Sequence, residues 1–254
     1  MQLRLIRNAT MVWDYAGQRI LTDPYFAPKF SLPSYSGRSP SPIVELPLTP
    51  AQILAGVDLV LLSHLHSDHF DPEAQRLVPT TLPFYCQGVD ARTLAEKGFR
   101  HVLGVETTLS WPAGTLTRIG GHHGQGSVET MMGTVSGYVL QAPGEPTVYW
   151  AGDSVLCDEV RAAIAHYQPD VIITHSGGAL WADAAAQPTL IIMDAAQTVE
   201  VSQAVPQATV VAIHLESVDH GTVTRAALRA AVAEAGVTDR VRVPEDGETL
   251  TLTA

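Results

Sequence analysis

A cluster of potential metal ligands lies in residues 63–71, which read Ser-His-Leu-His-Ser-Asp-His-Phe-Asp. Within this loop, His64 and His66 can reach one metal ion while Asp68 and His69 turn toward a second. A mixed set of imidazole and carboxylate ligands suits Zn, Fe or Mn, whereas Ca and Mg prefer oxygen donors alone. Core packing does not require this spacing of polar residues. The segment therefore predicts a transition-metal site.

The residues before this cluster predict how it is positioned. Asp58-Leu-Val-Leu-Leu62 is a short apolar run that is typical of a buried strand, so the cluster follows a strand's carboxyl end. Other β-forming runs also end in His or Asp, and strands of one sheet that end in ligands bring them to a single rim. These runs are residues 147–153, 170–175 and 209–214, with a weaker case at 115–123.

Helical and strand patterns alternate along most of the chain. Strand patterns near the amino terminus are followed by mixed strands and helices, which predicts two packed sheets with helices outside. Strands are expected at 3–6, 10–14 and 19–21, with a turn at Ala16-Gly17, and helices at 90–97, 157–167 and 224–235.

Residues 27–50 differ from the rest, because they hold six of the 17 prolines with Ser and Gly between them. A loop of this length in a compact domain is usually functional or disordered. We expect either a lid over the metal site or a plain surface excursion.

Composition limits the class of protein. A chain of 254 residues with 46% apolar and 16% charged residues supports a sizeable core and fits one domain, residues 1–254. Apolar runs are too short for a membrane helix and the start lacks a signal peptide's hydrophobic region. We therefore expect a soluble, cytoplasmic protein without a membrane partner.

The charge and the cysteines exclude further classes. A net charge of −11 disfavours nucleic-acid binding, because that binding depends on neutralising phosphates with basic residues. Cys86 and Cys157 form no C-x-x-C motif, so reduced thiols are expected.

In these residues the chain resembles the metallo-β-lactamase superfamily, and within it the branch of metal-dependent hydrolases that includes L-ascorbate-6-phosphate lactonase. The resemblance covers nearly the whole length. Its motifs are Leu21-Thr-Asp-Pro24, the H-x-H-x-D-H loop from His64, His123-Gly124, Gly152-Asp153-Ser154 and the strand ending in His214. It implies an α/β fold, the αββα four-layer sandwich, with the site at one edge of the two sheets.

The resemblance also implies a ligand set for two divalent transition-metal ions, zinc in the first place and Mn or Fe as alternatives. His123 is preferred to His122 because Gly124 follows it. Asp23 either supports the ligands from outside the coordination sphere or is a turn residue before Pro24. The first ion would be held by His64, His66 and His123, the second by Asp68, His69 and His214, and Asp153 would bridge them.

The function implied is hydrolysis of a small ester, lactone or similar bond by a metal-bound hydroxide, formed from a water that Asp68 or Asp153 orients and whose proton it then carries away. Alternatives are a small-molecule phosphodiesterase, a mononuclear iron dioxygenase or a non-catalytic binding protein. His66 stands where diiron electron-transfer relatives carry Glu, which disfavours that class.

The expected partner is a small-molecule substrate, and a homo-oligomer is possible. His175 ends a strand at the rim, so we expect it to contact substrate. His220 follows His214 closely and either contacts substrate or caps a loop. Arg38, with Lys29 nearby, could meet a carboxylate or phosphate on the substrate.

Overall fold

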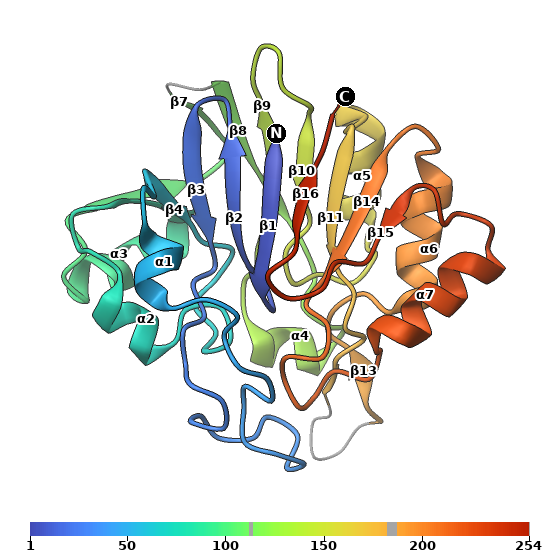
Figure 1. Ribbon diagram of the computed structural model, residues 1–254, viewed down its shortest axis with the longest axis horizontal. Coiled ribbons are helices and arrows are strands. Elements are labelled where there is room, and N and C mark those ends of the chain that lie inside the picture. The colour runs from blue at the N-terminus through green and yellow to red at the C-terminus, as the bar shows by residue number, and fades with distance from the viewer. Residues whose placement is uncertain (112–113, 182–186, 254) are drawn as a thin grey trace.

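Two large sheets form the centre of the computed structural model, which describes residues 1–111, 114–181 and 187–253 (Figure 1). In hydrogen-bonding order, the first sheet contains β16 (Thr249–Thr251), β1 (Gln2–Arg7), β2 (Thr10–Tyr15), β3 (Gln18–Thr22), β4 (Leu59–Leu61), β5 (Pro83–Gln87) and β6 (His101–Val105). The second contains β15 (Val241–Arg242), β14 (Thr209–Ile213), β11 (Val171–His175), β10 (Val148–Trp150), β9 (Ser136–Gln141), β8 (Gly114–Gly120) and β7 (Thr108–Trp111). A small hairpin pairs β12 (Leu180–Trp181) with β13 (Thr189–Leu190).

Each central strand is apolar on both faces, because each sheet is covered on both sides. Successive side chains of a strand point to opposite faces. In β4, Leu59 and Leu61 therefore join the core between the sheets, while Val60 joins the core beneath the outer helices. In β11, Ile173 and Ile172 divide between the inner and the outer core in the same way.

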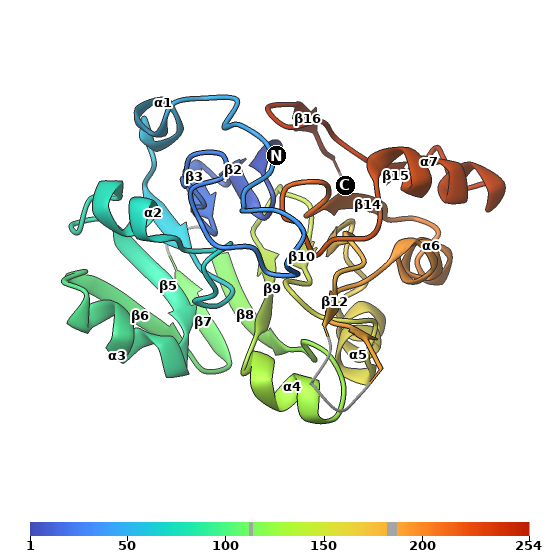
Figure 2. The same cartoon turned by 90° about the horizontal axis from the view of Figure 1, so that it is seen from below.

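Helices cover the two outer faces. Figures 1 and 2 show α1 (Pro50–Leu54), α2 (Pro72–Leu77) and α3 (Gly88–Glu96) on one side, and α5 (Asp158–Tyr167), α6 (Ala195–Ala204) and α7 (Arg225–Glu234) on the other. In α7, Leu228 and Val232 are buried one turn apart, and the Thr224 side chain caps the first turn. The predicted αββα sandwich is confirmed.

The elements expected from the pattern are present, with shifted ends. The turn at Ala16-Gly17 has positive φ at both residues, 50° and 74°. The expected strand at 115–123 stops at Gly120, and the expected helix at 90–97 begins two residues earlier, at Gly88. Both cysteines are free, as expected. In the described part of the chain, we find no helix with the length and apolar character needed to cross a bilayer.

One edge of the sandwich collects the loops that carry the predicted ligands. β10, β11 and β14 run parallel to one another, as do β3 and β4, so their carboxyl ends open at shared edges. The segment between β3 and α1 and the short helix α4 (Ser127–Met132) lie at the lower edge in Figure 1.

Candidate metal centre

The ligand loop between β4 and α2 is short and fixed at both ends. At its far end, the Asp71 carboxylate accepts hydrogen bonds from the backbone N–H groups of Glu73 and Ala74 and caps α2. Within the loop, the N–H groups of His69 and Phe70 both donate to the His66 carbonyl, at 3.0 and 2.9 Å. This tight turn places the loop's polar side chains at the sheet edge while Phe70 enters the outer core.

Two groups of side chains bring ligand atoms close together. The atoms of each group lie within 4.8 Å of one another. One group is His64, His66 and His123, and the other is His69, Asp153, His175 and His214. Asp153 also faces the first group, because its Oδ2 is 3.1 Å from His69 Nε2 and 3.6 Å from His123 Nε2.

Outer hydrogen bonds fix which nitrogen of several imidazoles is free. His66 Nε2 donates to the Met132 carbonyl at 2.9 Å, and His123 Nδ1 donates to the Ile191 carbonyl at 2.7 Å. Since a carbonyl can only accept, the other ring nitrogen carries a lone pair. This is the arrangement of metal-ligating histidines, whose second nitrogen binds a protein oxygen.

His64 Nε2 gives further evidence of fit. It is buried, and among the described residues it has no hydrogen-bond partner. A buried polar atom without a partner is costly, and a metal ion would satisfy it. The donor set of the two groups therefore fits divalent transition metals.

Asp23 supports the cluster, which is the first of the two roles that the sequence left open for it. Its Oδ2 accepts from His69 Nδ1 at 2.7 Å and from Ser63 Oγ at 2.6 Å, and its Oδ1 accepts from the Ser63 N–H at 2.8 Å. These bonds hold the His69 ring with Nε2 toward Asp153.

Asn8 is a supporting residue that sequence reasoning missed. Its side-chain amide donates to the Asp68 carbonyl at 2.9 Å and lies 3.3 Å from His214 Nε2. Asn8 and His214 both adopt positive φ, near 60°, and the His214 N–H donates to the Asn8 carbonyl. Left-handed conformations are uncommon for residues other than glycine, although Asn and His adopt them more readily than most, and they often occur at functional sites. An Asn in a β-turn gives no sequence signal for this role.

Charges inside the cluster set the protonation of its members. Burial alone would raise the pKa of Asp153, but His69 and His214 hold it well below its usual range. Burial lowers the pKa of His64 well below its ordinary value and that of His123 to about 4. At neutral pH these two imidazoles are uncharged and the carboxylate is ionised, which is the state that metal binding requires.

His69 is the exception among the imidazoles. Burial would lower its pKa, but Asp153, Asp68 and Asp23 together raise it well above its ordinary value. A metal ion that uses His69 must therefore displace a proton.

His175 lies behind the cluster, which differs from its expected contact with substrate. Its Nε2 accepts from the Trp150 indole N–H at 2.8 Å, so its Nδ1 is the protonated nitrogen and donates to Asp153 Oδ1. The side chain is fully buried and is not among the residues lining the cavity. His175 therefore orients Asp153, and Trp150 orients His175. Sequence analysis did not single out Trp150.

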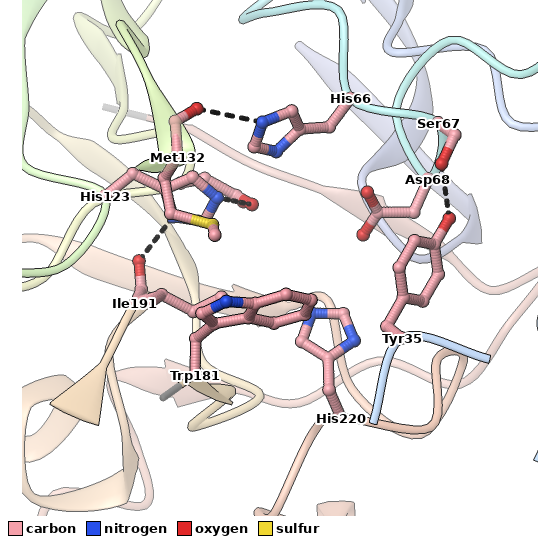
Figure 3. A pocket seen from close by; sticks show the side chains of 10 residues that line it. Tyr35, His66, Ser67, Asp68, His123, Met132, Trp181, Ile191 and His220 are labelled. Carbon is pink, nitrogen blue, oxygen red and sulfur yellow. Dashed lines mark hydrogen bonds and ion pairs between the residues drawn. The ribbon is translucent and has the colours of Figure 1, made fainter. Parts of the chain in front are cut away.

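A small cavity of about 170 Å³ opens beside the cluster (Figure 3). Predicted ligands form one side of it, and apolar and aromatic side chains form the other. None of its lining residues in the described part of the chain is Lys or Arg. The lining residues are Tyr35, His66, Ser67, Asp68, His123, Met132, Asp153, Trp181, Ile191 and His220.

His220 lies in the cavity wall, where substrate contact was expected of it. Its ring centroid is 5.1 Å from that of Tyr35 and 6.5 Å from that of Trp181. Its Nδ1 is buried without a hydrogen-bond partner among the described residues. In Figure 3 the ring lies between Trp181 and Tyr35, facing the space next to Asp68.

Arg38 does not reach the cavity, contrary to its expected role. Its guanidinium donates to the carbonyls of Asp219 and Gly221, and its Nε donates to Ser36 Oγ at 2.9 Å. These acceptors hold the side chain at the surface, and Arg38 is not among the residues lining the cavity. We do not retain it as a substrate contact.

The Pro-rich segment contributes Tyr35 to the wall of the cavity and is held at its base and at its tip. At the base, Arg7 is fully buried and donates to the carbonyls of Tyr25, Ala27 and Val44. At the tip, the Asp219 carboxylate accepts from backbone N–H groups and hydroxyls of residues 34–41. Tyr35 then faces the cavity, and its hydroxyl lies 2.7 Å from Ser67 Oγ. Opening of this wall as a lid stays a prediction.

Comparison with known proteins identifies the family. A model of the beta-lactamase superfamily domain matches residues 18–215. The chain belongs to this superfamily. It is also 34% identical over 257 residues to the UPF0173 protein YddR of Bacillus subtilis, covering 99% of this chain and 100% of that protein. A UPF0173 metal-dependent hydrolase of Xanthobacter autotrophicus is 25% identical over 190 residues, 70% of this chain and 72% of the relative.

A solved structure extends this agreement to the whole fold. The isothiocyanate hydrolase from Delia radicum gut bacteria is 32% identical and superposes with a TM-score of 0.94, covering 100% of both chains. The protein is therefore a metal-dependent hydrolase of the metallo-β-lactamase fold. The narrower resemblance to L-ascorbate-6-phosphate lactonase stays a prediction, since none of these relatives carries that name.

Proposed function

We propose that the chain hydrolyses a small neutral molecule at an electrophilic carbon, with isothiocyanates, R–N=C=S, as the first substrate class. The observation that carries this proposal is the cavity, whose described lining pairs the His/Asp cluster with apolar walls and includes no Lys or Arg. Recognition of a carboxylate or phosphate normally uses such a cation. Similarity over the full chain to an isothiocyanate hydrolase supports the same substrate class.

The size of the cavity favours a small substrate. Its volume of about 170 Å³ is close to that of an engineered cavity of about 150 Å³ that holds benzene. Met132, Trp181 and Ile191 offer an apolar surface to the R group, and Asp68 lies across the cavity from Met132 (Figure 3). Neutral esters and lactones satisfy the same limits and form the second candidate class, whereas phosphodiesters fit less well.

The ligand set for two divalent ions, zinc in the first place, is part of this proposal. His64, His66 and His123 would hold one ion, Asp68, His69 and His214 the other, and Asp153 both. Such ions lower the pKa of a bound water to about 7 and polarise the group under attack.

The remaining work falls to residues of the cavity. Asp68 lines it and lies 3.4 Å from His214 Nε2, so its carboxylate is placed to accept the proton of the attacking water. His220 lines the same space, and its imidazole can bind the nitrogen of the substrate. His175 and Trp150 hold Asp153 in place from behind.

The reaction balances without an oxidant or reductant. The water oxygen bonds to the central carbon and one proton moves to the nitrogen, which gives a thiocarbamic acid. Its C–N bond then breaks and the second proton moves to the nitrogen, so R–NH₂ and COS leave the site. For an ester or lactone, the same attack would break the C–O bond.

The test is a substrate panel with metal-loaded protein. We expect allyl and benzyl isothiocyanate to be turned over, with release of the amine and COS, at least about tenfold more efficiently than neutral esters and lactones. Chelated protein serves as the control. Faster ester or lactone cleavage would favour the second class, and cleavage of only an anionic phosphodiester, or of nothing in the panel, would reject the proposal.

A further inference from the structure

A second group of ligand-type side chains lies outside the cavity. Ligand atoms of His122, Cys157 and Glu159 lie within 4.8 Å of one another. The side chains of His122 and Glu159 are 38% and 49% exposed, so an ion could enter from solvent. None of these three residues lines the cavity beside the central cluster.

The two nitrogens of His122 have different surroundings. Nε2 lies 3.1 Å from Glu159 Oε2, on the side of the group, and Nδ1 lies 2.5 Å from Oε1 of Glu129 in α4. The hydrogen bond to Glu159, together with Glu129, raises the pKa of His122, so a cation that binds Nε2 must displace a proton there while Nδ1 keeps donating to Glu129. A carboxylate that holds the second nitrogen of an imidazole is the usual support of a ligating histidine.

Backbone contacts hold this group together. The N–H of His122 donates to Ser154 Oγ at 2.9 Å, and the N–H of Val155 donates to the His122 carbonyl at 3.0 Å. Cys157 is the residue before the first turn of α5, and Glu159 lies in that turn. These bonds fix the backbone at His122 against the segment that leads into α5, which carries Cys157 and Glu159.

We propose that His122 Nε2, Cys157 Sγ and the Glu159 carboxylate bind one thiophilic divalent cation of the Zn²⁺ type, separate from the central His/Asp cluster. Glu129 would orient the imidazole. One sulfur, one nitrogen and one oxygen ligand, completed by water, suit tetrahedral zinc, whereas Ca and Mg would reject sulfur and nitrogen. The Cys157 thiol loses its proton to solvent when the metal–sulfur bond forms.

The proposed cation site is linked to the cavity through α4 and through the residue next to His122. Glu129 belongs to α4, whose last residue, Met132, lines the cavity, and His122 directly precedes the cavity residue His123. An ion held here would join α4 to the start of α5 beside the cavity.

Cobalt binding tests the proposal by its spectrum and needs no turnover, so it is independent of the proposed function. The central cluster contains only His and Asp, so its cobalt cannot give a thiolate-to-metal charge-transfer band. We expect Co²⁺ added to the full chain to give this near-ultraviolet band, Cys157→Ser to abolish it, and Cys86→Ala to retain it. Glu129→Gln should weaken the binding by about 10- to 100-fold while leaving the band at saturation.

The alternative is that His122 only forms ion pairs between the two glutamates, which predicts bound cobalt without the band. Absence of the band in the wild-type protein, or its survival in Cys157→Ser, would overturn the proposal. Circular dichroism of each variant, recorded beside the titration, separates loss of the ligand from loss of the fold. If Cys157→Ser does not fold, the Glu129→Gln and Cys86→Ala titrations decide.

Discussion

The central His/Asp cluster and the wall that the Pro-rich residues 27–50 form are held in place in different ways. Cluster members such as His69 and Asp153 are almost fully buried, and their polar atoms contact one another. In the wall, Tyr35 is half-buried and Arg38 exposed, and the segment is held mainly by hydrogen bonds to its backbone. Buried charges interact strongly, so the cluster should control turnover, while the wall should control substrate binding.

Asp68→Asn should have the largest effect. It weakens a predicted metal ligand and removes the proton acceptor in the cavity, so we expect kcat to fall by about 10²- to 10⁴-fold with the fold retained. Kinetics on the best substrate of the panel, with circular dichroism, would measure this. Asp58→Asn is the matched control, since Asp58 is exposed at the opposite end of β4. Undiminished activity of Asp68→Asn would contradict the role of the cluster.

The adjacent histidines 122 and 123 test the boundary of the cluster. His123 is buried with Nε2 3.6 Å from Asp153, whereas His122 is exposed and lies between Glu129 and Glu159. We expect His123→Ala to lose metal from the central cluster and most activity, and His122→Ala to keep both. Elemental analysis after dialysis would show this when both variants are made in the Cys157→Ser background, which lacks the proposed second cation site. Equal loss of the central metal in both variants would show that the boundary is wrong.

Asp219→Asn should disturb the wall and leave the cluster intact. The Asn side chain has one acceptor oxygen where the Asp carboxylate has two, so it cannot accept from both the Tyr35 and the Ser36 N–H groups as the carboxylate does. We therefore expect a loss of about 1–3 kcal/mol in the free energy of unfolding. KM should rise more than kcat falls, because Tyr35 is displaced from the cavity. Asp239→Asn, at an exposed site, is the control. A fall in kcat alone would place Asp219 with the cluster.

The same residue predicts a pH dependence. Burial alone would raise the pKa of Asp219, but hydrogen bonds from the wall hold it below its ordinary value. Its stabilising effect is then complete above the unfolded pKa of about 3.9 and is lost as the pH falls through the lowered folded value. Urea unfolding of the wild-type and Asp219→Asn proteins should therefore converge at low pH. A difference in stability that persists unchanged there would argue against this carboxylate as the source.

Arg38→Ala should have the smallest effect. Its donors serve two backbone carbonyls at an exposed site, so we expect kcat and KM to change by no more than about twofold. Steady-state kinetics with neutral and anionic substrates would measure this. A rise in KM confined to anionic substrates would show that Arg38 contacts the substrate, as expected from the sequence. The wall would then contribute a charged side chain to substrate binding.

Local patterns were sufficient to predict much of the fold. Short β-forming runs such as residues 58–62 and 209–214 are strands in the structure, and the Thr224 cap marks the start of α7. The exact ends were less predictable, because hydrogen bonding in the sheet and not residue type decides where β8 stops at Gly120. The αββα order itself came from the family resemblance together with the alternation of elements.

The sequence by itself determined the donor chemistry, because four ligand-type residues in six positions, after a strand, restrict the choice of metal and reaction. Only the tertiary structure decided which residues support them. Asn8, Trp150 and Asp219 carry no motif, and their roles depend on partners that are more than 20 residues away in sequence. Packing of the two sheets brings His214 to Asn8, strand pairing brings His175 to Trp150, and the course of the Pro-rich segment brings Tyr35 to Asp219. It also moved His175 behind Asp153 and Arg38 out of the cavity, since the direction of a side chain depends on the acceptors around it.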